Sequence, residues 1–235
     1  MARAPVGDER NTAARGDLWL LANHDFRQPA QTLAFLAAGL AGRASRAERQ
    51  EQAAGIALMA ASLEAMVDMM TLIARYDNGH LTADPVRLAL AELLGPLTDR
   101  MSSLAGQNGR RLEVGGLDAT VQADAELVHW IATGMLIYAI KHADKPEIAV
   151  RVRTRRAHVA LEVRYFGPDP EKALARMAFV ELPPVRTAPG VPVIGLGPAL
   201  AARLAIHAGL DIEPGVEPSG GRHLALMMPK GRRPA

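Results

Sequence analysis

The chain has no cysteine among its 235 residues, and only 4% of its residues are aromatic. The lack of cysteine excludes disulfides and thiolate metal sites, although it does not by itself fix the cellular compartment. No run reaches the roughly 18 uncharged apolar residues that a membrane span needs, and the N-terminus is polar where a signal peptide would be apolar. We therefore expect a cytoplasmic protein without membrane insertion.

Hydrophobic residues make up 49% of the chain and charged residues 22%, which is typical of a globular protein with a core of Leu, Ala, Val and Met. The length favours one domain of about 150 residues with a smaller second part. Although the pI is 9.2, the net charge is only +2 and the basic residues are scattered among carboxylates. The composition therefore gives no reason to expect nucleic acid as a partner.

One local group of arginines stands on a predicted hairpin, where alternate residues share a face. Its members are Arg151, Arg153, Arg155, Arg156 and Arg164. A solvated sheet face is the first interpretation, an acidic protein partner the second and nucleic acid the third.

The N-terminal part is predicted to be a helical hairpin. Residues 1–16 lack periodicity and are interpreted as a loose tail. From Asp17 apolar residues recur at steps of three and four, and Ser45 with Glu48 forms a capping-box pattern that opens a second helix, which ends at Asn78. The seam of this second helix consists of Ile56, Met59, Leu63, Met66, Met70 and Ile73. A lone hairpin cannot cover its apolar seams, so we predict a homodimer that forms a four-helix bundle over residues 17–80.

The pattern becomes mixed after residues 79–86, which contain Gly, Asp and Pro and make a plausible domain boundary. Helices are predicted around 86–105, from Asp124 to about His142, and up to about residue 208. Strands are predicted near 111–115, 119–122, 147–154 and 158–166 and at the end of the chain, with a short helix and a Pro-rich loop at 183–198 between. The predicted fold class is therefore α+β, with an α/β sandwich over residues 86–230 after the hairpin.

His24 is the first candidate for chemistry. At about 100° per residue the apolar positions of its helix cluster on one side, and His24 falls nearly opposite them, beside Gln28 and Gln31. This phase predicts a solvent-facing imidazole. An ordinary surface histidine without a chemical role would have the same helical phase, so this interpretation of His24 stays open.

The residues NHDFRQPAQTL (23–33) resemble the H-box of two-component histidine kinases, in the variant that reads His-Asp-Leu-Arg-Gln-Pro, with the helix-bending Pro29. The segment LIARYDNGHL (72–81) is similar to the end of that family's dimerisation domain. The resemblance implies that His24 is the phosphoacceptor, since a neutral imidazole is a competent nucleophile for a phosphoryl group.

Three neighbours of His24 receive roles from the same resemblance. Asp25 would orient or deprotonate the imidazole, Arg27 would neutralise phosphate charge, and Gln28 would position water for dephosphorylation. Asp25 and Gln28 also have a plain interpretation as solvated polar residues on a helix, and Arg27 as a partner of a nearby acidic residue.

By its order of elements, the second part resembles the ATP-binding domain that follows the hairpin in histidine kinases. At the family's two Asn positions, the segment GMLIYAIKHA (134–143) has Gly134 and Tyr138, so metal coordination should suffer. In YFGPDP (165–170), Tyr165 stands where the family has the Asp that recognises adenine, and Asp169 replaces the second Gly of that motif, after the remnant Gly167.

The last glycine-rich motif survives in part as VIGLGPAL (193–200), with Gly195 and Gly197 before a helix. A tight turn from loop to helix explains those glycines equally well. The loop PPVRTAPGVPV would correspond to the family's lid over ATP. With three contacts replaced, we expect no bound cofactor, neither ATP nor Mg²⁺, and no resident metal.

The sequence therefore predicts a histidine phosphotransferase of a bacterial phosphorelay that moves phosphate between response-regulator receiver domains through His24. One alternative is an ATP-dependent sensor kinase with a diverged pocket. A second is a non-catalytic scaffold or inhibitor of a two-component pathway, and a phosphatase acting through Gln28 is compatible with the first interpretation. The expected partners are receiver domains, a second copy of the chain and a sensor kinase.

Overall fold

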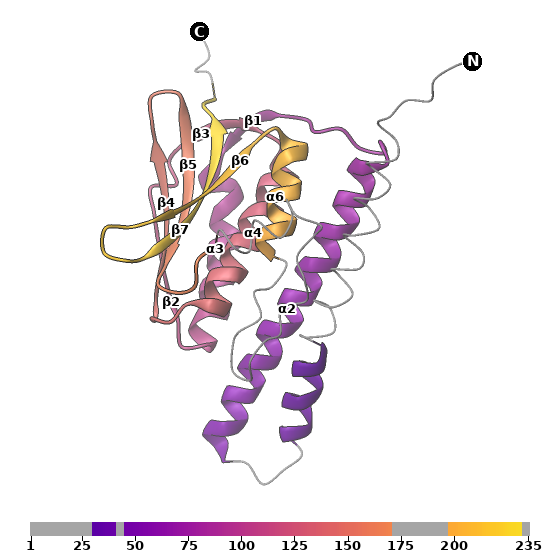
Figure 1. Ribbon diagram of the computed structural model, residues 1–235, viewed down its shortest axis with the longest axis vertical. Coiled ribbons are helices and arrows are strands. Elements are labelled where there is room, and N and C mark those ends of the chain that lie inside the picture. Colours follow the sequence, from indigo (N-terminus) through magenta and orange to yellow (C-terminus); the bar gives the residue numbers. More distant parts are fainter. Residues whose placement is uncertain (1–29, 41–44, 171–196, 232–235) are drawn as a thin grey trace, which may run out of the picture.

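The computed structural model describes residues 30–40, 45–170 and 197–231. Its N-terminal part contains the helical segment Ala30–Leu40 and the long helix α2 (Arg46–Asp77), which lie beside each other in Figure 1. The predicted capping box is confirmed: the Ser45 hydroxyl accepts from the Glu48 amide at 3.2 Å, and the Glu48 carboxylate accepts from the Ser45 amide at 2.6 Å. Two donors at the helix start are satisfied in this way.

Helix α2 buries one broad apolar stripe. Four of the six residues of the predicted seam are buried, and the other two, Ile56 and Leu63, are half-buried. The structure adds a second set of buried apolar residues on this helix, Leu58, Ala65, Met69 and Leu72, which belong to the core that α2 shares with the α/β domain. In Figure 1, α2 runs along the helical layer of that domain.

The α/β domain follows in one continuous run of elements. Its strands are β1 (Val86–Ala89), β2 (Arg111–Gly115), β3 (Thr120–Ala123), β4 (Glu147–Thr154), β5 (His158–Tyr165), β6 (Asp211–Val216) and β7 (Arg222–Pro229). Its helices are α3 (Leu90–Gln107), α4 (Ala125–His142) and α6 (Gly197–Ala208). Five strands form one sheet in the order β2-β4-β5-β7-β6, in which only the β2–β4 pair is parallel.

Residues 86–89 form a strand where a helix was predicted. They pair antiparallel with β3, with Val86 opposite Ala123 and Ala89 opposite Thr120. The partner strand lies more than thirty positions along the chain, so the pairing is a tertiary contact that overrides the local helical pattern. The helix begins only at Leu90, whose amide donates to the Ala119 carbonyl at 2.9 Å.

Helix α4 occupies the centre of the molecule, between the sheet and α2 (Figure 1). The Asp124 carboxylate caps it, as predicted, by accepting from the Leu127 amide at 3.1 Å. Thirteen of its eighteen residues are buried, including every residue from Ile131 to Ile140, which is typical of a helix that is covered on every side. The predicted α+β class is confirmed, with a helical N-terminal part followed by an α/β domain.

Within the part of the chain that the structure describes, one helix, α2, is long and apolar enough, by length and composition alone, to cross a membrane. Half of the apolar stretch of this helix is buried inside the structure. A helix that packs in the core of a protein passes the same test of length and composition, so the test alone does not indicate a membrane span.

Candidate functional site

The predicted phosphoacceptor segment precedes the described part of the chain. His24, Asp25, Arg27 and Gln28 all lie outside the described residues, and so does Gly195. Their roles therefore stay predictions. The structure does describe the helical segment Ala30–Leu40 that follows them.

The two tyrosines at the eroded nucleotide motifs lie against each other. Tyr138, on α4, and Tyr165, at the end of β5, are each only 2% exposed, and their ring centroids are 5.8 Å apart in an edge-to-face arrangement. The Tyr165 hydroxyl donates to the Pro168 carbonyl at 3.1 Å, and burial raises the pKa of both phenols. Such an arrangement is favourable for aromatic rings, so the pair contributes to the core.

Gly167, a remnant of the second motif, has a packing role in this structure. A Cβ at this position would lie 2.6 Å from the carbonyl oxygen of His142, at the end of α4. Next to it, the Asp144 amide donates to the Phe166 carbonyl at 2.7 Å. Only glycine lets the turn after β5 approach the end of α4 so closely.

Two of the described positions that the resemblance assigns to a nucleotide site offer no amide oxygen to a metal ion. Gly134 has no side chain, and Tyr138 places a buried ring where an amide oxygen would coordinate the metal. Within the described ranges, no three His, Asp or Glu side chains are grouped closely enough to hold a metal ion. Gly197 begins α6, but the glycine-rich segment that leads to it lies outside the described residues.

His142 completes the aromatic cluster. Its ring centroid is 4.7 Å from that of Tyr138, and it is 7% exposed. Burial, with a smaller contribution from the charge of Lys141, lowers the pKa of His142 from its ordinary value of 6.5 to about 4. The imidazole is therefore neutral in the folded protein at physiological pH.

This shift predicts a loss of stability in acid. Between pH 6.5 and 4 the unfolded chain protonates His142 and the folded chain does not, so the free energy of unfolding should fall by up to about 3 kcal/mol as the pH decreases through that window. Urea denaturation at pH 7 and pH 4.5 measures the change. A His142→Phe variant should lose much less stability over the same interval, whereas His80→Phe, at an exposed histidine, should behave like the parent protein. An unchanged pH dependence in His142→Phe would contradict the assignment.

A polar junction joins the end of α2 to the α/β domain. Arg203 and His207, both on α6, contact the Asp77 carboxylate at 2.9 Å each. The ring of Tyr76 stacks on that of His207, with 5.2 Å between the ring centroids. The Tyr76 hydroxyl lies 3.4 Å from the carboxylate of Asp124 that caps α4. These contacts fix how the hairpin helix meets the domain. Sequence reasoning missed the junction because its members lie in three separate segments.

The predicted arginine cluster forms ion pairs on the sheet. Three of its members contact the buried carboxylate of Glu162, namely Arg164 at 2.6 Å, Arg153 at 3.2 Å and Arg155 at 3.8 Å. A fourth, Arg151, pairs with Glu113 at 3.4 Å. Because these arginines already have carboxylate partners, the geometry favours the interpretation as a solvated sheet face over a docking site for an acidic protein.

Comparison with solved structures identifies the fold. The chain is similar to the histidine kinase AdeS of Acinetobacter baumannii, with a TM-score of 0.56 and 12% identity over 89% of this chain and 98% of that one. It also matches the catalytic domain of the histidine kinase ThkA, with a TM-score of 0.48 and 18% identity over 63% of this chain and 97% of that domain. The match to AdeS shows that the chain has a histidine-kinase-like fold.

A curated relative points in the same direction. The sensor protein CopS of Pseudomonas syringae pv. tomato is 26% identical over 108 residues, which are 46% of this chain and 22% of CopS. The chain thus spans only a small part of that relative. No protein-family model matches the chain.

Proposed function

We propose that this chain is a two-component signalling protein of the histidine kinase type, and that His24 is the residue that carries phosphate. The observation that carries the proposal is the match of His24 to Pro29 with the H-box, in a chain whose fold is histidine-kinase-like. The predicted helix of that motif continues as the described segment Ala30–Leu40, beside α2. A solvent-facing imidazole on such a helix is open to a phosphate donor.

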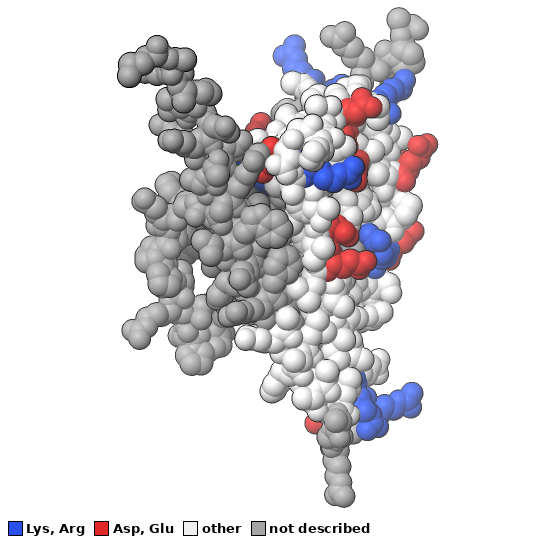
Figure 2. All heavy atoms as spheres, turned by 90° about the vertical axis from the view of Figure 1, so that its right-hand side faces the viewer, with Lys and Arg blue, Asp and Glu red and all other residues white. Residues whose placement is uncertain are grey.

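The proposed partners are response-regulator receiver domains and a second copy of the chain. Three large apolar side chains of the hairpin are exposed, Phe35 at 79%, Val67 at 52% and Leu40 at 37%. Figure 2, which views the side that carries α2, shows a broad uncharged area over the lower half of the described surface, above a basic group near the tip. Apolar surface on paired helices supports burial in a four-helix bundle.

Of the two routes of phosphate to His24, the one from ATP, in which the chain would be a sensor kinase, has the support of the similar proteins. AdeS is a histidine kinase and CopS is a sensor protein. This supports the kinase alternative above the phosphotransferase that the eroded motifs first predicted. The kinase needs a nucleotide site that differs from the family's at positions 134, 138 and 165.

A second candidate, the phosphotransferase, is favoured by the packing of Tyr138 against Tyr165. These rings are buried where the resemblance places a metal ligand and the adenine contact. A phosphorylated receiver domain brings its phosphate and its own magnesium, so transfer to His24 would need no nucleotide pocket in this chain.

Incubating the purified chain with radiolabelled ATP, or with phosphorylated receiver domains from the same organism, separates these candidates. Label from ATP supports the kinase, and label only from a receiver supports the phosphotransferase. If neither donor labels the chain and the chain still binds a kinase or a regulator, the proposed function is refuted. The non-catalytic scaffold would then be the remaining interpretation.

A further inference from the structure

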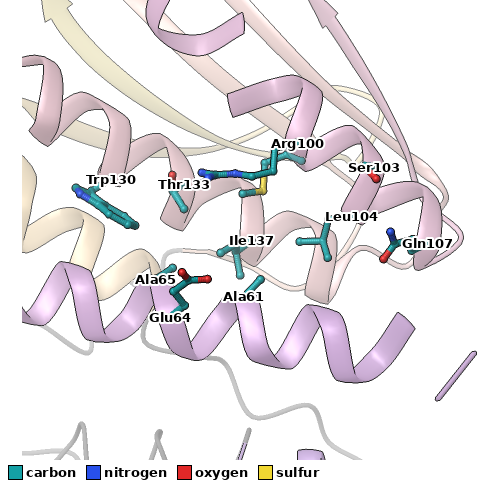
Figure 3. Close-up of a pocket in the computed structure, with 11 residues that line it drawn as sticks. Ala61, Glu64, Ala65, Arg100, Ser103, Leu104, Gln107, Trp130, Thr133 and Ile137 are labelled. Carbon is teal, nitrogen blue, oxygen red and sulfur yellow. The ribbon is translucent and has the colours of Figure 1, made fainter. Parts of the chain in front are cut away.

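A pocket of about 310 Å³ opens between α2, α3 and α4 (Figure 3). Its apolar lining consists of Ala61, Ala65, Met101, Leu104, Trp130 and Ile137. Two alanines one turn apart on α2 leave the space open, and Trp130 offers an aromatic surface. The volume is at the lower end of the range for small-molecule sites.

Two opposite charges stand on facing walls of this pocket. Figure 3 shows the Glu64 side chain rising from α2 and the Arg100 side chain reaching across from α3. Both residues are exposed, and among the described residues neither makes an ion pair with the other or with a third group. The pocket thus has an apolar interior between a carboxylate and a guanidinium, the two groups that an ammonium and a carboxylate of a ligand would pair with.

We propose that this pocket binds a small zwitterionic molecule with a compact apolar body, a carboxylate for Arg100 and an ammonium group for Glu64. An apolar body alone would leave both charges unused, and a ligand with a single charge would use only one of them. Because α2 belongs to the hairpin and the other two walls belong to the α/β domain, the bound molecule joins the two parts. Binding therefore raises the melting temperature of the chain.

The test uses three related probes on the full chain: para-aminomethylbenzoate, benzoate and benzylamine. The only tryptophans are Trp19 and Trp130, so in a Trp19→Phe background the fluorescence reports on the pocket. The zwitterion is expected to bind about tenfold more tightly than either singly charged probe, since one charged contact contributes about that much. It should also raise the melting temperature.

Substitutions on the pocket walls give the controls. Glu64→Gln and Arg100→Gln should each weaken binding of the zwitterion about tenfold, and Ala61→Phe should fill the pocket and abolish binding of all three probes. Glu51→Gln, at an exposed carboxylate on α2 outside the pocket, should leave the affinity unchanged.

Three results would overturn the inference. The first is a failure of the zwitterion to bind at millimolar concentration, and the second is equal binding of the three probes. The third is a Trp130 spectrum that changes with protein concentration without any probe, because a second copy of the chain would then cover the pocket. None of these results depends on phosphorylation of His24.

Discussion

Replacing His24 by alanine is expected to abolish phosphorylation of the chain from every donor. In the proposed reaction, a neutral imidazole nitrogen attacks the phosphorus, so that a new N–P bond forms as the bond from phosphorus to the donor oxygen breaks. Alanine offers no nucleophile, and neighbouring groups such as Asp25 could only assist one. The measurement is the amount of radiolabel on the chain after incubation with labelled ATP or with a labelled receiver domain.

A matched histidine provides the control for this variant. His80 is exposed just after the end of α2, so His80→Ala removes an accessible imidazole from the same hairpin. It should retain full labelling, because the proposal places the phosphate on His24 alone. Undiminished label on His24→Ala would show that another residue accepts the phosphate, and would refute the assignment.

Local signals predicted the boundaries of several elements well. The Ser45 capping box and the Asp124 cap mark the starts of α2 and α4 in the structure, since a cap depends on side chains only a few residues away. The alternation of apolar residues likewise located β4 and β5. Signals that act within one turn of helix or one strand are legible in a single sequence.

Contacts between distant segments could not be read in the same way. Strand β1 exists because β3 pairs with it, and the junction at Asp77 exists because α6 returns to the end of α2. The full width of the buried stripe of α2 was missed for the same reason, because a seam of steps three and four describes a narrow contact, whereas this helix shares a core with several helices of the α/β domain. Each of these features depends on the assembled fold.

The candidate site shows the same difference between local sequence signals and contacts of the folded chain. The family resemblance located Tyr138 and Tyr165 as replacements, but their spacing in sequence gave no sign that the two rings meet. Nor did it show that Gly167 permits the close approach to His142, or that Glu162 gathers the arginines of the sheet. Tyr138 and Tyr165, which the motif comparison treated as replacements of nucleotide contacts, pack against each other in the structure.

The contact between the two tyrosines leads to the largest predicted effect on stability. Tyr138 is 2% exposed in the centre of the molecule, and Tyr138→Ala would leave a cavity there. Truncation of a buried aromatic side chain typically lowers the free energy of unfolding by about 3–5 kcal/mol. Urea denaturation at a fixed protein concentration measures this loss. Tyr138→Phe, which keeps the ring, should cost less than about 1.5 kcal/mol.

A double-mutant cycle with Tyr165→Ala tests whether the two rings stabilise each other directly. If the edge-to-face contact contributes on its own, the double variant should be destabilised by about 1 kcal/mol less than the two single losses added together. Additive losses would mean that each ring only fills space. A loss below about 1 kcal/mol in Tyr138→Ala would contradict the packing role assigned to this ring.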